Sequence, residues 1–573
     1  MSEHRAQGAT GDGRMLIGID VGGTTTDAVL IDGRRVVSEA AVATAPHNLA
    51  GSVLRALDCI LESIRPTQVQ RIVLSTTVIT NLLAENKAEP VGLILLPGPG
   101  ANPSDYGLPP AHIVHGAVDY RGREIAPLDE AGVRAAGAAL RAEGLSRVAV
   151  VGKFCQRNPQ HERSAKALLL EESPDAVVEC GHMVSARLNF PRRVATTLLT
   201  LATRDHYGEY AREMSRALRE RGLCAPIFVL KADGGTLPLD YSLRTPVETI
   251  FSGPAASTMG AVALAPPGES FVMLDVGGTT TDLALVLDGQ PLLASKGARV
   301  HDLLTHVRSF AVKSVPVGGD SAVRAHEGVL TVGPDRMGPP ACLGGPFPTP
   351  TDALRVLGAI DLGNAEAARS AMAEVAVALG TGPEGASRRV VDALASTIAG
   401  EVETMFAHWR DEPVYRIWEV LREEHARPAL LVGVGGGAPS LAPAAASLLG
   451  MKCLVPEHAA VANALGAALS RPTMALTLSM DTSQGTWVAE EDGRGGRLED
   501  LRLSLAGAEH MALEMLAARA EEAGIGSYAG DALVTHSEVF NMVRGYSTIG
   551  RLLDVTVEIP AGILNDWSAA HGE

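Results

Sequence analysis

The chain has 573 residues, with 49 Lys and Arg against 66 Asp and Glu, so its formal net charge at pH 7 is −17. Hydrophobic residues make up 46% of the chain, which is enough to build full cores and excludes a disordered protein. The acidic balance argues against nucleic acid or an anionic membrane as a partner, and no apolar run approaches the roughly 20 residues of a membrane span. We therefore expect a cytoplasmic protein of several folded domains.

The first predicted segment in chain order is a flexible leader at residues 1–14, which has no secretory h-region. Single cysteines without a CxxC pair argue against a disulfide framework. Cys180 and His182 come nearest to a metal-ligand pair, but two such residues alone rarely form a closed zinc site. We expect reduced thiols at all six positions, which are Cys59, Cys155, Cys180, Cys224, Cys342 and Cys453.

The first structured element is predicted to be a β-hairpin around the octapeptide DVGGTTTD at residues 20–27. Apolar segments, MLIGI before it and AVLID after it, flank a Gly-Gly turn. Further along, residues 71–74 predict a strand that leads through a Thr-rich turn into a helix, and residues 129–144 predict a helix followed by the strand RVAVVG. This alternation is typical of an α/β protein.

The same octapeptide recurs unchanged at residues 275–282. A plain hairpin turn accounts for its glycines, but not for an Asp before them and three Thr after them in both copies. Glycines let backbone N–H groups approach an oxyanion, and Thr hydroxyls add further donors. We therefore predict that the two hairpins bind the phosphates of a nucleotide, through Gly22, Gly23, Thr24, Thr25 and Thr26 in the first copy and Gly277, Gly278, Thr279, Thr280 and Thr281 in the second.

The aspartates of the repeat supply the hard oxygen ligands that Mg²⁺ prefers. We predict that Asp20 and Asp275 are catalytic and bind Mg²⁺ directly or through water, and that Asp282 is a further Mg²⁺ ligand. Asp27 and Asp282 also close their hairpins, and a structural role for at least one of them is the alternative. Neither copy is a GxxxxGK[ST] loop or a GxGxxG turn.

Two short segments between the hairpins are candidate neighbours of the substrate or the phosphates. Lys231 and Asp233 follow the predicted strand PIFVLK, where a turn with solvated charges is an equal alternative. Ser252 precedes an Ala-rich helix whose N-terminus could bind an anion. A helix cap is at least as good an explanation of this serine.

The last glycine-rich segment follows a predicted buried strand near Val432 and leads into a helix. Its glycines would form a flat backbone surface for adenosine. Beyond about residue 471, a helix at 509–523 and the strands VFNMVRGYSTIG and LLDVTVEI predict a small α+β domain with one solvated face. The predicted adenosine-binding residues are Gly433, Gly435, Gly436 and Gly437.

This order of elements resembles the actin, sugar kinase and Hsp70 superfamily. Within it, the doubled DVGGTTTD resembles the hydantoinase A/5-oxoprolinase family, in its shorter subgroup. STTVITNLL at residues 75–83, FSGPAAS at 251–257 and PTPTDALRVLG at 348–358 also match family segments. The segment AVKSVPVGGDS departs from the family's His-Thr pattern, with Lys313, Ser314 and Asp320.

The resemblance implies an α/β fold with two actin-like (ribonuclease H-like) lobes around an ATP cleft and a small α+β carboxy-terminal cap. We expect four segments along the chain: the leader at 1–14, an N-terminal lobe with the first hairpin at 15–190, a core with the second hairpin and the adenosine loop at 191–470, and the C-terminal domain at 471–573.

The resemblance also implies an ATP- and Mg²⁺-dependent hydrolase of the 5-oxoprolinase/N-methylhydantoinase class. Such an enzyme phosphorylates the carbonyl oxygen of a small cyclic amide, namely a lactam, a hydantoin or an oxoproline-like ring. A separately encoded, metal-dependent hydantoinase B-like subunit is the implied partner, with no role for nucleic acid or membrane. The alternatives are an acetone carboxylase-like subunit, a small-molecule kinase and a non-catalytic nucleotide switch.

Overall fold

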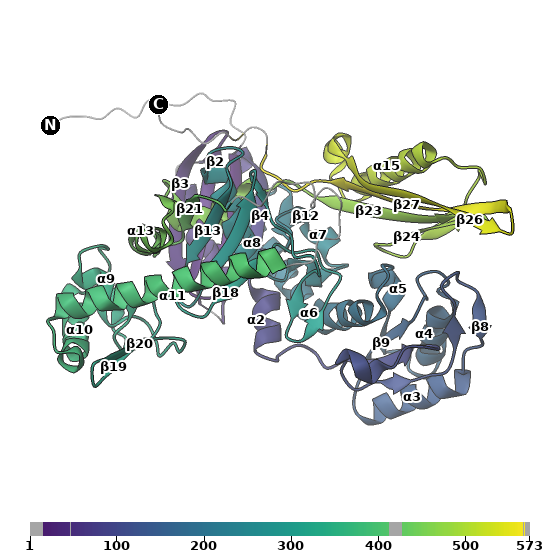
Figure 1. The fold of residues 1–573 in the computed structure, drawn as a ribbon, viewed down its shortest axis with the longest axis horizontal. Helices are drawn as coiled ribbons and strands as arrows, with labels where there is room; N and C mark the ends of the chain where they lie inside the picture. Colours follow the sequence, from purple (N-terminus) through teal and green to yellow (C-terminus); the bar gives the residue numbers. More distant parts are fainter. Residues whose placement is uncertain (1–14, 46, 63, 412–426, 565–566, 568–573) are drawn as a thin grey trace.

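The computed structural model describes residues 15–45, 47–62, 64–411, 427–564 and 567, so the predicted leader lies outside the described residues. Two six-stranded sheets form the centre of the molecule, and a five-stranded C-terminal sheet extends from them on one side (Figure 1). Within the described ranges, no helix is both long enough and apolar enough to cross a membrane.

The first central sheet contains the first octapeptide. Its hairpin pairs β1 with β2 in antiparallel fashion and sets Asp20 opposite Asp27, as the sequence predicts. β4 runs parallel to β1, and β11 runs parallel to β4, so the carboxyl ends of these three strands meet at one edge. The strand order is β12 (Thr236–Pro238), β11 (Ile227–Leu230), β4 (Val69–Thr76), β1 (Met15–Val21), β2 (Thr25–Asp32) and β3 (Arg35–Ala43).

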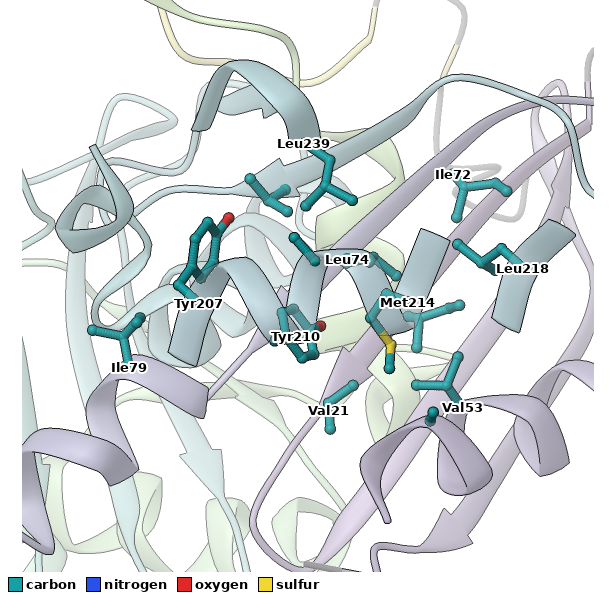
Figure 2. Packing of buried hydrophobic residues seen from close by; sticks show 14 of the residues in the cluster. Val21, Val53, Ile72, Leu74, Ile79, Tyr207, Tyr210, Met214, Leu218 and Leu239 are labelled. Carbon is teal, nitrogen blue, oxygen red and sulfur yellow. The ribbon is translucent and has the colours of Figure 1, made fainter. Parts of the chain in front are cut away.

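The long helix α6 (Phe190–Glu220) covers one face of this sheet together with α1 (Leu49–Leu61) and α2 (Val78–Ala84). Figure 2 shows Tyr210 and Met214 of α6 packed against the strands beside Val53 of α1. Each fully buried apolar side chain of this kind contributes about 1.5–3 kcal/mol. The first sheet and the helices that cover it thus contain residues from before and after residue 190. The domain boundary expected at residue 190 stays a prediction.

The second central sheet repeats the arrangement around the second octapeptide. β13 (Phe271–Val276) and β14 (Thr281–Leu287) form an antiparallel hairpin that sets Asp275 opposite Asp282. β21 (Leu430–Val434) lies parallel to β13 on its other side, as β4 does beside β1. The sheet is completed by β15 (Gln290–Pro291), β18 (Val312–Val315) and β22 (Lys452–Leu454).

Two small-residue helices, α8 (Ser252–Leu264) and α14 (Ala462–Leu469), cross between the sheets. A Cβ on Gly260 would lie 1.9 Å from the carbonyl oxygen of Ala462, and one on Gly466 would lie 2.1 Å from the carbonyl oxygen of Ala256. Only glycine allows backbones to approach so closely. The crossing therefore fixes how near the two sheets, and their hairpins, can come.

Two further units extend from the central sheets. The first is a four-stranded sheet with the predicted helix α3 (Glu130–Ala142), which is capped by the Asp129 carboxylate and ends before Gly144 in the left-handed region (φ 79°). Its other elements are β5 (Gly92–Leu96), β6 (His112–Ile113), β9 (Arg147–Gly152), β10 (Val177–Cys180), α4 (Gln160–Glu172) and α5 (Gly181–Val184). The second unit contains β19 (Val323–His326), β20 (Val329–Val332), α9 (Pro350–Val356), α10 (Ala365–Leu379) and α11 (Pro383–Asp411).

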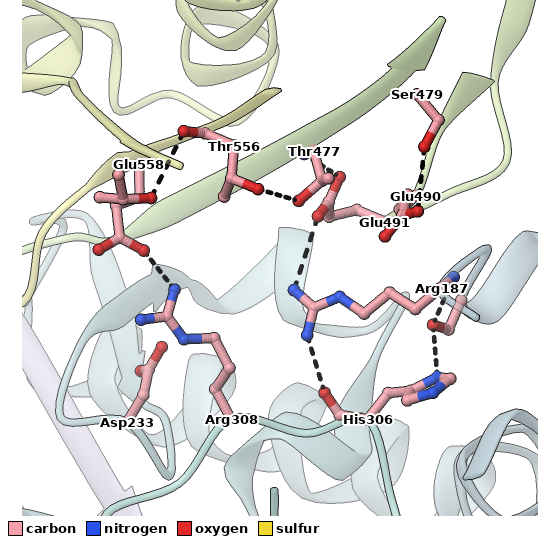
Figure 3. Close-up of polar contacts among 12 residues, drawn as sticks. Arg187, Asp233, His306, Arg308, Thr477, Ser479, Glu490, Glu491, Thr556 and Glu558 are labelled. Atoms are coloured by element: carbon pink, nitrogen blue, oxygen red, sulfur yellow. Dashed lines mark hydrogen bonds and ion pairs between the residues drawn. The ribbon is translucent and has the colours of Figure 1, made fainter. Parts of the chain in front are cut away.

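The C-terminal sheet confirms the predicted alternation along its β27 (Ser547–Ile559). Leu553, Val555 and Val557 are buried in a cluster with α15 (Leu505–Glu522), which begins before the predicted residue 509 because Ser504 caps it. The opposite face differs from the prediction of a solvated face, since part of it faces Arg187 and Arg308 across a cavity (Figure 3). The remaining strands are β23 (Met474–Asp481), β24 (Thr486–Ala489), β25 (Gly495–Arg497) and β26 (Leu533–Arg544).

Candidate functional site

The aspartates of the first hairpin lie in a buried acidic group. Burial raises the pKa of Asp20 to about 6, although the neighbouring Ser75 hydroxyl and Asn463 amide lower it, and the charge of Asp275 raises it further. Burial raises the pKa of Asp27 to about 7, with Asn463 opposing the shift and the charges of Asp20 and Asp275 adding to it. The charge of Asp275 thus acts on both aspartates of the first hairpin, as expected if the two hairpins face each other.

The second hairpin contributes in the same way. Burial raises the pKa of Asp282 to about 7, and the charge of Asp275 adds to this shift. Burial also raises the pKa of Asp275, against a hydrogen bond from Ser257. Among the described residues none of these four carboxylates forms an ion pair, and Asp20 Oδ1 and Asp282 Oδ1 are buried without a hydrogen-bond partner. Because uncompensated buried carboxylates are costly, this group fits a divalent cation.

Two residues that the sequence analysis missed hold these carboxylates. Asn463 of α14 donates hydrogen bonds from Nδ2 to Asp20 (2.8 Å) and Asp27 (2.9 Å). Ser257 of α8 donates from its hydroxyl to Asp275. Each lies three residues before the glycine at which the two helices cross. Through these side chains, α14 contacts the first hairpin and α8 contacts the second. A polar residue three positions before a glycine, in two Ala-rich helices, was the available signal.

The two glycine turns have the same hydrogen bonds but different surroundings. Gly22 N–H donates to Thr25 O and Gly277 N–H to Thr280 O, both at 3.0 Å. A Cβ on Gly23 would meet nothing within 4 Å, whereas one on Gly278 would lie 2.8 Å from the Asp320 carboxylate. The first turn therefore faces open space, where a phosphate can approach.

The loop between β18 and β19 covers the second turn. Gly319 N–H donates to Gly277 O at 3.0 Å, and Asp320 N–H donates to Gly278 O at 2.7 Å. The Asp320 carboxylate pairs with Arg336 at 3.0 Å. This is the segment in which the chain departs from the family pattern, and here it packs directly on the hairpin.

Two of the predicted phosphate-binding threonines face the protein. Thr26 is fully buried, with its hydroxyl hydrogen-bonded to that of Thr44 at 2.9 Å. Thr281 is also fully buried and donates to the carbonyl oxygen of Val317 at 2.8 Å. Their hydroxyls stabilise the strand starts, so we no longer assign them to phosphate. The remaining four, which are exposed or half-buried, keep that predicted role: Thr24, Thr25, Thr279 and Thr280.

The glycines of the predicted adenosine loop divide into packing and open positions. A Cβ on Gly433 would lie 2.5 Å from Ala442, and one on Gly437 would lie 2.5 Å from Val276, so these two allow α13 (Ala438–Leu449) to pack on the sheet. Gly435 has a positive φ (85°), and its Cβ would lie 2.3 Å from Asp275 Oδ1. A Cβ on Gly436 would meet nothing. The loop thus lies against the second hairpin, with Gly436 as its open position.

The other three predicted site residues, Lys231, Asp233 and Ser252, lie in two different parts of the structure. Lys231 and Asp233 form a buried ion pair (3.2 Å) and line a large cavity beside the C-terminal sheet. The Ser252 hydroxyl donates to Thr76 O (2.8 Å) and accepts from Thr76 N–H (3.1 Å), so it ties α8 to β4 instead of capping its own helix. Lys313 pairs with Glu401 of α11.

Cys180 and His182 lie beside Glu162, with their potential ligand atoms within 4.8 Å of one another. The Glu162 carboxylate already accepts hydrogen bonds from Gly152 N–H (2.7 Å), from His182 N–H (2.9 Å) and at His182 Nδ1. These bonds satisfy a buried carboxylate without a metal. The trio therefore joins α4, α5 and β9 as a structural contact.

Comparison with known proteins identifies two family models along the chain. The hydantoinase/oxoprolinase N-terminal region matches residues 16–173, and hydantoinase/oxoprolinase matches residues 193–475. The caprolactamase subunit alpha of Pseudomonas jessenii is 29% identical over 385 residues, covering 60% of this chain and 54% of that protein. The acetophenone carboxylase gamma subunit of Aromatoleum aromaticum is 28% identical over 395 residues, covering 60% and 53%. The chain thus spans about half the length of these relatives.

Two solved structures share the fold. A nucleotide-free acetone carboxylase structure matches with a TM-score of 0.72 and 19% identity, over 96% of this chain and 88% of that one. The ATP-dependent caprolactamase from Pseudomonas jessenii matches with a TM-score of 0.67 and 23% identity, over 95% and 87%. These matches confirm the predicted α/β fold with actin-like lobes.

Proposed function

The chain belongs to the hydantoinase/oxoprolinase family, and from this premise we propose that it is the ATP-binding subunit of an ATP-dependent cyclic amide hydrolase. The observation that carries the proposal is the group of four carboxylates without cations between two identical glycine turns. A caprolactamase and an acetone carboxylase described as ATP-dependent share the fold, which supports a nucleotide at this place. The acceptor would be a lactam, a hydantoin or an oxoproline-like ring.

The residues present fit Mg²⁺. Asp20 and Asp275 would hold it, directly or through water, and the unpartnered oxygen of Asp282 makes this residue the third candidate. Bound there, the ion would neutralise charge on a polyphosphate and on its leaving group. Asn463 and Ser257 would keep the carboxylates in position. Phosphates would approach the open side of Gly23, and adenosine the open Gly436.

Phosphoryl transfer needs positioning and charge neutralisation more than covalent help from the protein. An amide oxygen carries partial negative charge and can attack the γ-phosphorus without a strong base. The bond from the γ-phosphorus to the ADP oxygen breaks, and a bond to the amide oxygen forms. Two water molecules then supply both oxygens of the product carboxylate. The ring nitrogen takes a proton and leaves as the amine, and phosphate departs with the former amide oxygen.

A separately encoded hydantoinase B-like subunit would complete the hydrolysis. The similar proteins are named as subunits: alpha of caprolactamase, gamma of acetophenone carboxylase and, in Xanthobacter autotrophicus, beta of acetone carboxylase. These names support a hetero-oligomer. If the purified chain alone opened a lactam ring with coupled use of ATP, a partner would not be required.

A second candidate function is that of a carboxylase subunit. The acetone carboxylase structure and the acetophenone carboxylase relative favour it. Such an enzyme would need bicarbonate together with a ketone, and amides would not stimulate its use of ATP.

The test is an ATPase screen of the chain, with and without a co-purifying partner, against lactams, hydantoins, sugars and ketones with bicarbonate. We expect one class of cyclic amide to stimulate phosphate release. Stimulation by a ketone with bicarbonate would favour the carboxylase. A stable phosphorylated sugar would indicate a kinase, and slow ATP hydrolysis that no small molecule changes would indicate a nucleotide switch.

A further inference from the structure

A cavity of about 1080 Å³ lies between the first sheet, the segments that contain Phe271 and Arg308, and the C-terminal sheet. The carboxylates of the two hairpins do not line it. One part of its wall is apolar and includes Met259, Phe271, Phe310 and Ile559. Pockets for small molecules typically combine such a wall with a few placed polar groups, so the polar part of the wall decides what the cavity can bind.

The charges on the polar part balance, and three pairs of them face the cavity. Lys231 lies 3.2 Å from Asp233, and Arg308 lies 2.5 Å from Glu558. A third pair joins Arg187 to Glu491 across the cavity at 3.6 Å (Figure 3). Because each of these cations faces a carboxylate, they provide no surplus of positive charge for an anionic ligand. The wall suits an uncharged molecule with polar atoms.

Several buried or half-buried groups on this wall have donors or acceptors that are not used in hydrogen bonds among the described residues. The hydroxyl of Thr473, which is 5% exposed, has no hydrogen-bond partner among the described residues, and the same holds for Glu491 Oε1. Arg187 donates to the His306 carbonyl oxygen at 3.3 Å, while its contact with Glu491 is longer than a hydrogen bond. The Lys231 ammonium has three donors, one of which is directed at Asp233. Buried polar groups of this kind need a partner.

The position of the cavity suits an acceptor of phosphate. Lys231 directly follows β11, which is two strands away from β1 and ends at the same edge of the sheet as Asp20. Since neighbouring strands lie about 4.8 Å apart, the backbone of Lys231 is about 10 Å from the backbone of Asp20 along this edge. A small molecule in the cavity is therefore near the hairpins without displacing a nucleotide.

We propose that this cavity binds the acceptor substrate, and that the substrate is an uncharged lactam with an apolar ring and not an anionic one such as 5-oxoproline. This inference rests on the proposed function. The ring methylenes pack on Met259 and Phe310, and Glu491 Oε1 accepts the ring N–H. Lys231 donates to one lone pair of the carbonyl oxygen, which leaves the other lone pair for the attack on the γ-phosphorus.

Calorimetric titration of the full chain, with a non-hydrolysable ATP analogue present, tests this with caprolactam and 5-oxoproline as probes. We expect caprolactam to bind at least tenfold more tightly. Ala475 lines the cavity from β23, opposite Glu558, and Ala475→Trp should fill it and weaken caprolactam binding at least tenfold. The control Val543→Trp, on an exposed strand of the same sheet (62% exposed), should bind caprolactam as the unmodified chain does.

If Ala475→Trp does not fold, as judged by thermal unfolding, Lys231→Met takes its place with the same expected loss. Unchanged caprolactam binding in the folded variant, tighter binding of 5-oxoproline, or no binding of either probe to the unmodified chain would overturn the cavity assignment. Amide-stimulated ATP use in that same preparation would leave the proposed function standing. Lactam binding without any amide-stimulated ATP use, partner included, would support the cavity and count against the proposed function.

Discussion

The hairpin cleft and the large cavity both contain carboxylates, but among the described residues only the carboxylates of the cavity have cations beside them. The hairpin cleft is the region around the four hairpin carboxylates, Asp20, Asp27, Asp275 and Asp282. Around the cavity, Asp233 is paired with Lys231 and Glu558 with Arg308. In the cleft, no ion pair to Asp20 or Asp275 occurs among the described residues. The difference teaches which ligand each region suits: the uncompensated carboxylates of the cleft fit a cation from outside the chain, and the balanced charges of the cavity wall fit a neutral molecule.

The pKa shifts follow the same division. Burial raises the pKa of Asp20 to about 6 and that of Asp282 to about 7, since no neighbouring cation opposes it. Burial acts on Asp233 as well, but the charges of Lys231 and Arg308 outweigh it and hold the pKa below its usual range. Burial therefore leaves the pKa of a carboxyl group raised where the chain supplies no neighbouring cation, and neighbouring cations reverse the shift where it does.

The largest predicted effect is in the cleft. Asp20→Asn or Asp275→Asn removes a ligand charge for Mg²⁺, and we expect Mg-ATP turnover to fall by about 100-fold or more, as for the loss of a key electrostatic contact. Steady-state phosphate release measures it, and circular dichroism checks the fold. Asp302→Asn, at a side chain that is 93% exposed, is the matched control. Normal turnover in both cleft variants would contradict the assignment of Asp20 and Asp275 to the Mg-ATP site.

The next prediction compares the two turns. Gly23→Val should lower nucleotide affinity at least tenfold with little change in stability, because its side chain enters open space that a phosphate would occupy. Gly278→Val should instead destabilise the fold by about 1–3 kcal/mol, as overpacking does, because its Cβ would meet Asp320. Nucleotide titration and urea unfolding of both variants measure the contrast. Equal effects on both quantities would show that the turns are equivalent.

A smaller effect is expected at the residue that joins two carboxylates of the cleft. Asn463→Ala removes the donor to Asp20 and Asp27, and should lower the free energy of unfolding by about 1.5–3 kcal/mol, the range for a hydrogen bond to a charged group. Urea unfolding without metal measures it. Asn81→Ala, at an exposed amide that donates to Thr77, is the control. An equal loss in the two variants would contradict the role given to Asn463.

The smallest effect concerns the cavity wall, where burial, followed by the charges of Arg187 and Arg193, lowers the pKa of His306 to about 3. The folded state then binds fewer protons than the unfolded state between pH 3 and pH 6.5, so this imidazole costs stability as the pH falls. From pH 6.5 to about 5.5 the unmodified chain should lose about 1 kcal/mol more than His306→Gln. Chemical unfolding at the two pH values measures this, and parallel losses would contradict it.

Much of the fold was predictable because it rests on short-range patterns. Alternating apolar residues and the Gly-Gly turns predict both hairpins, and Gly144 predicts the end of α3. The supports of the site are long-range: Asn463 and Asp20 are 443 residues apart, and the cover over Gly278 comes from a separate loop. The sequence could not show that Thr26 and Thr281 are buried while the threonines before them are not, since all six are the same residue type. Only their positions on β2 and β14 direct these two side chains into the protein.

Transfer of the γ-phosphoryl group to the amide oxygen is tested most directly with a lactam that carries ¹⁸O in its carbonyl group. The enzyme preparation that shows amide-dependent ATP use would be allowed to turn over, and the phosphate and the ring-opened acid would be examined by mass spectrometry. We predict that the ¹⁸O appears in the released phosphate and that both carboxylate oxygens come from water. Phosphate without the label, with ¹⁸O retained in the carboxylate, would contradict phosphorylation of the amide oxygen.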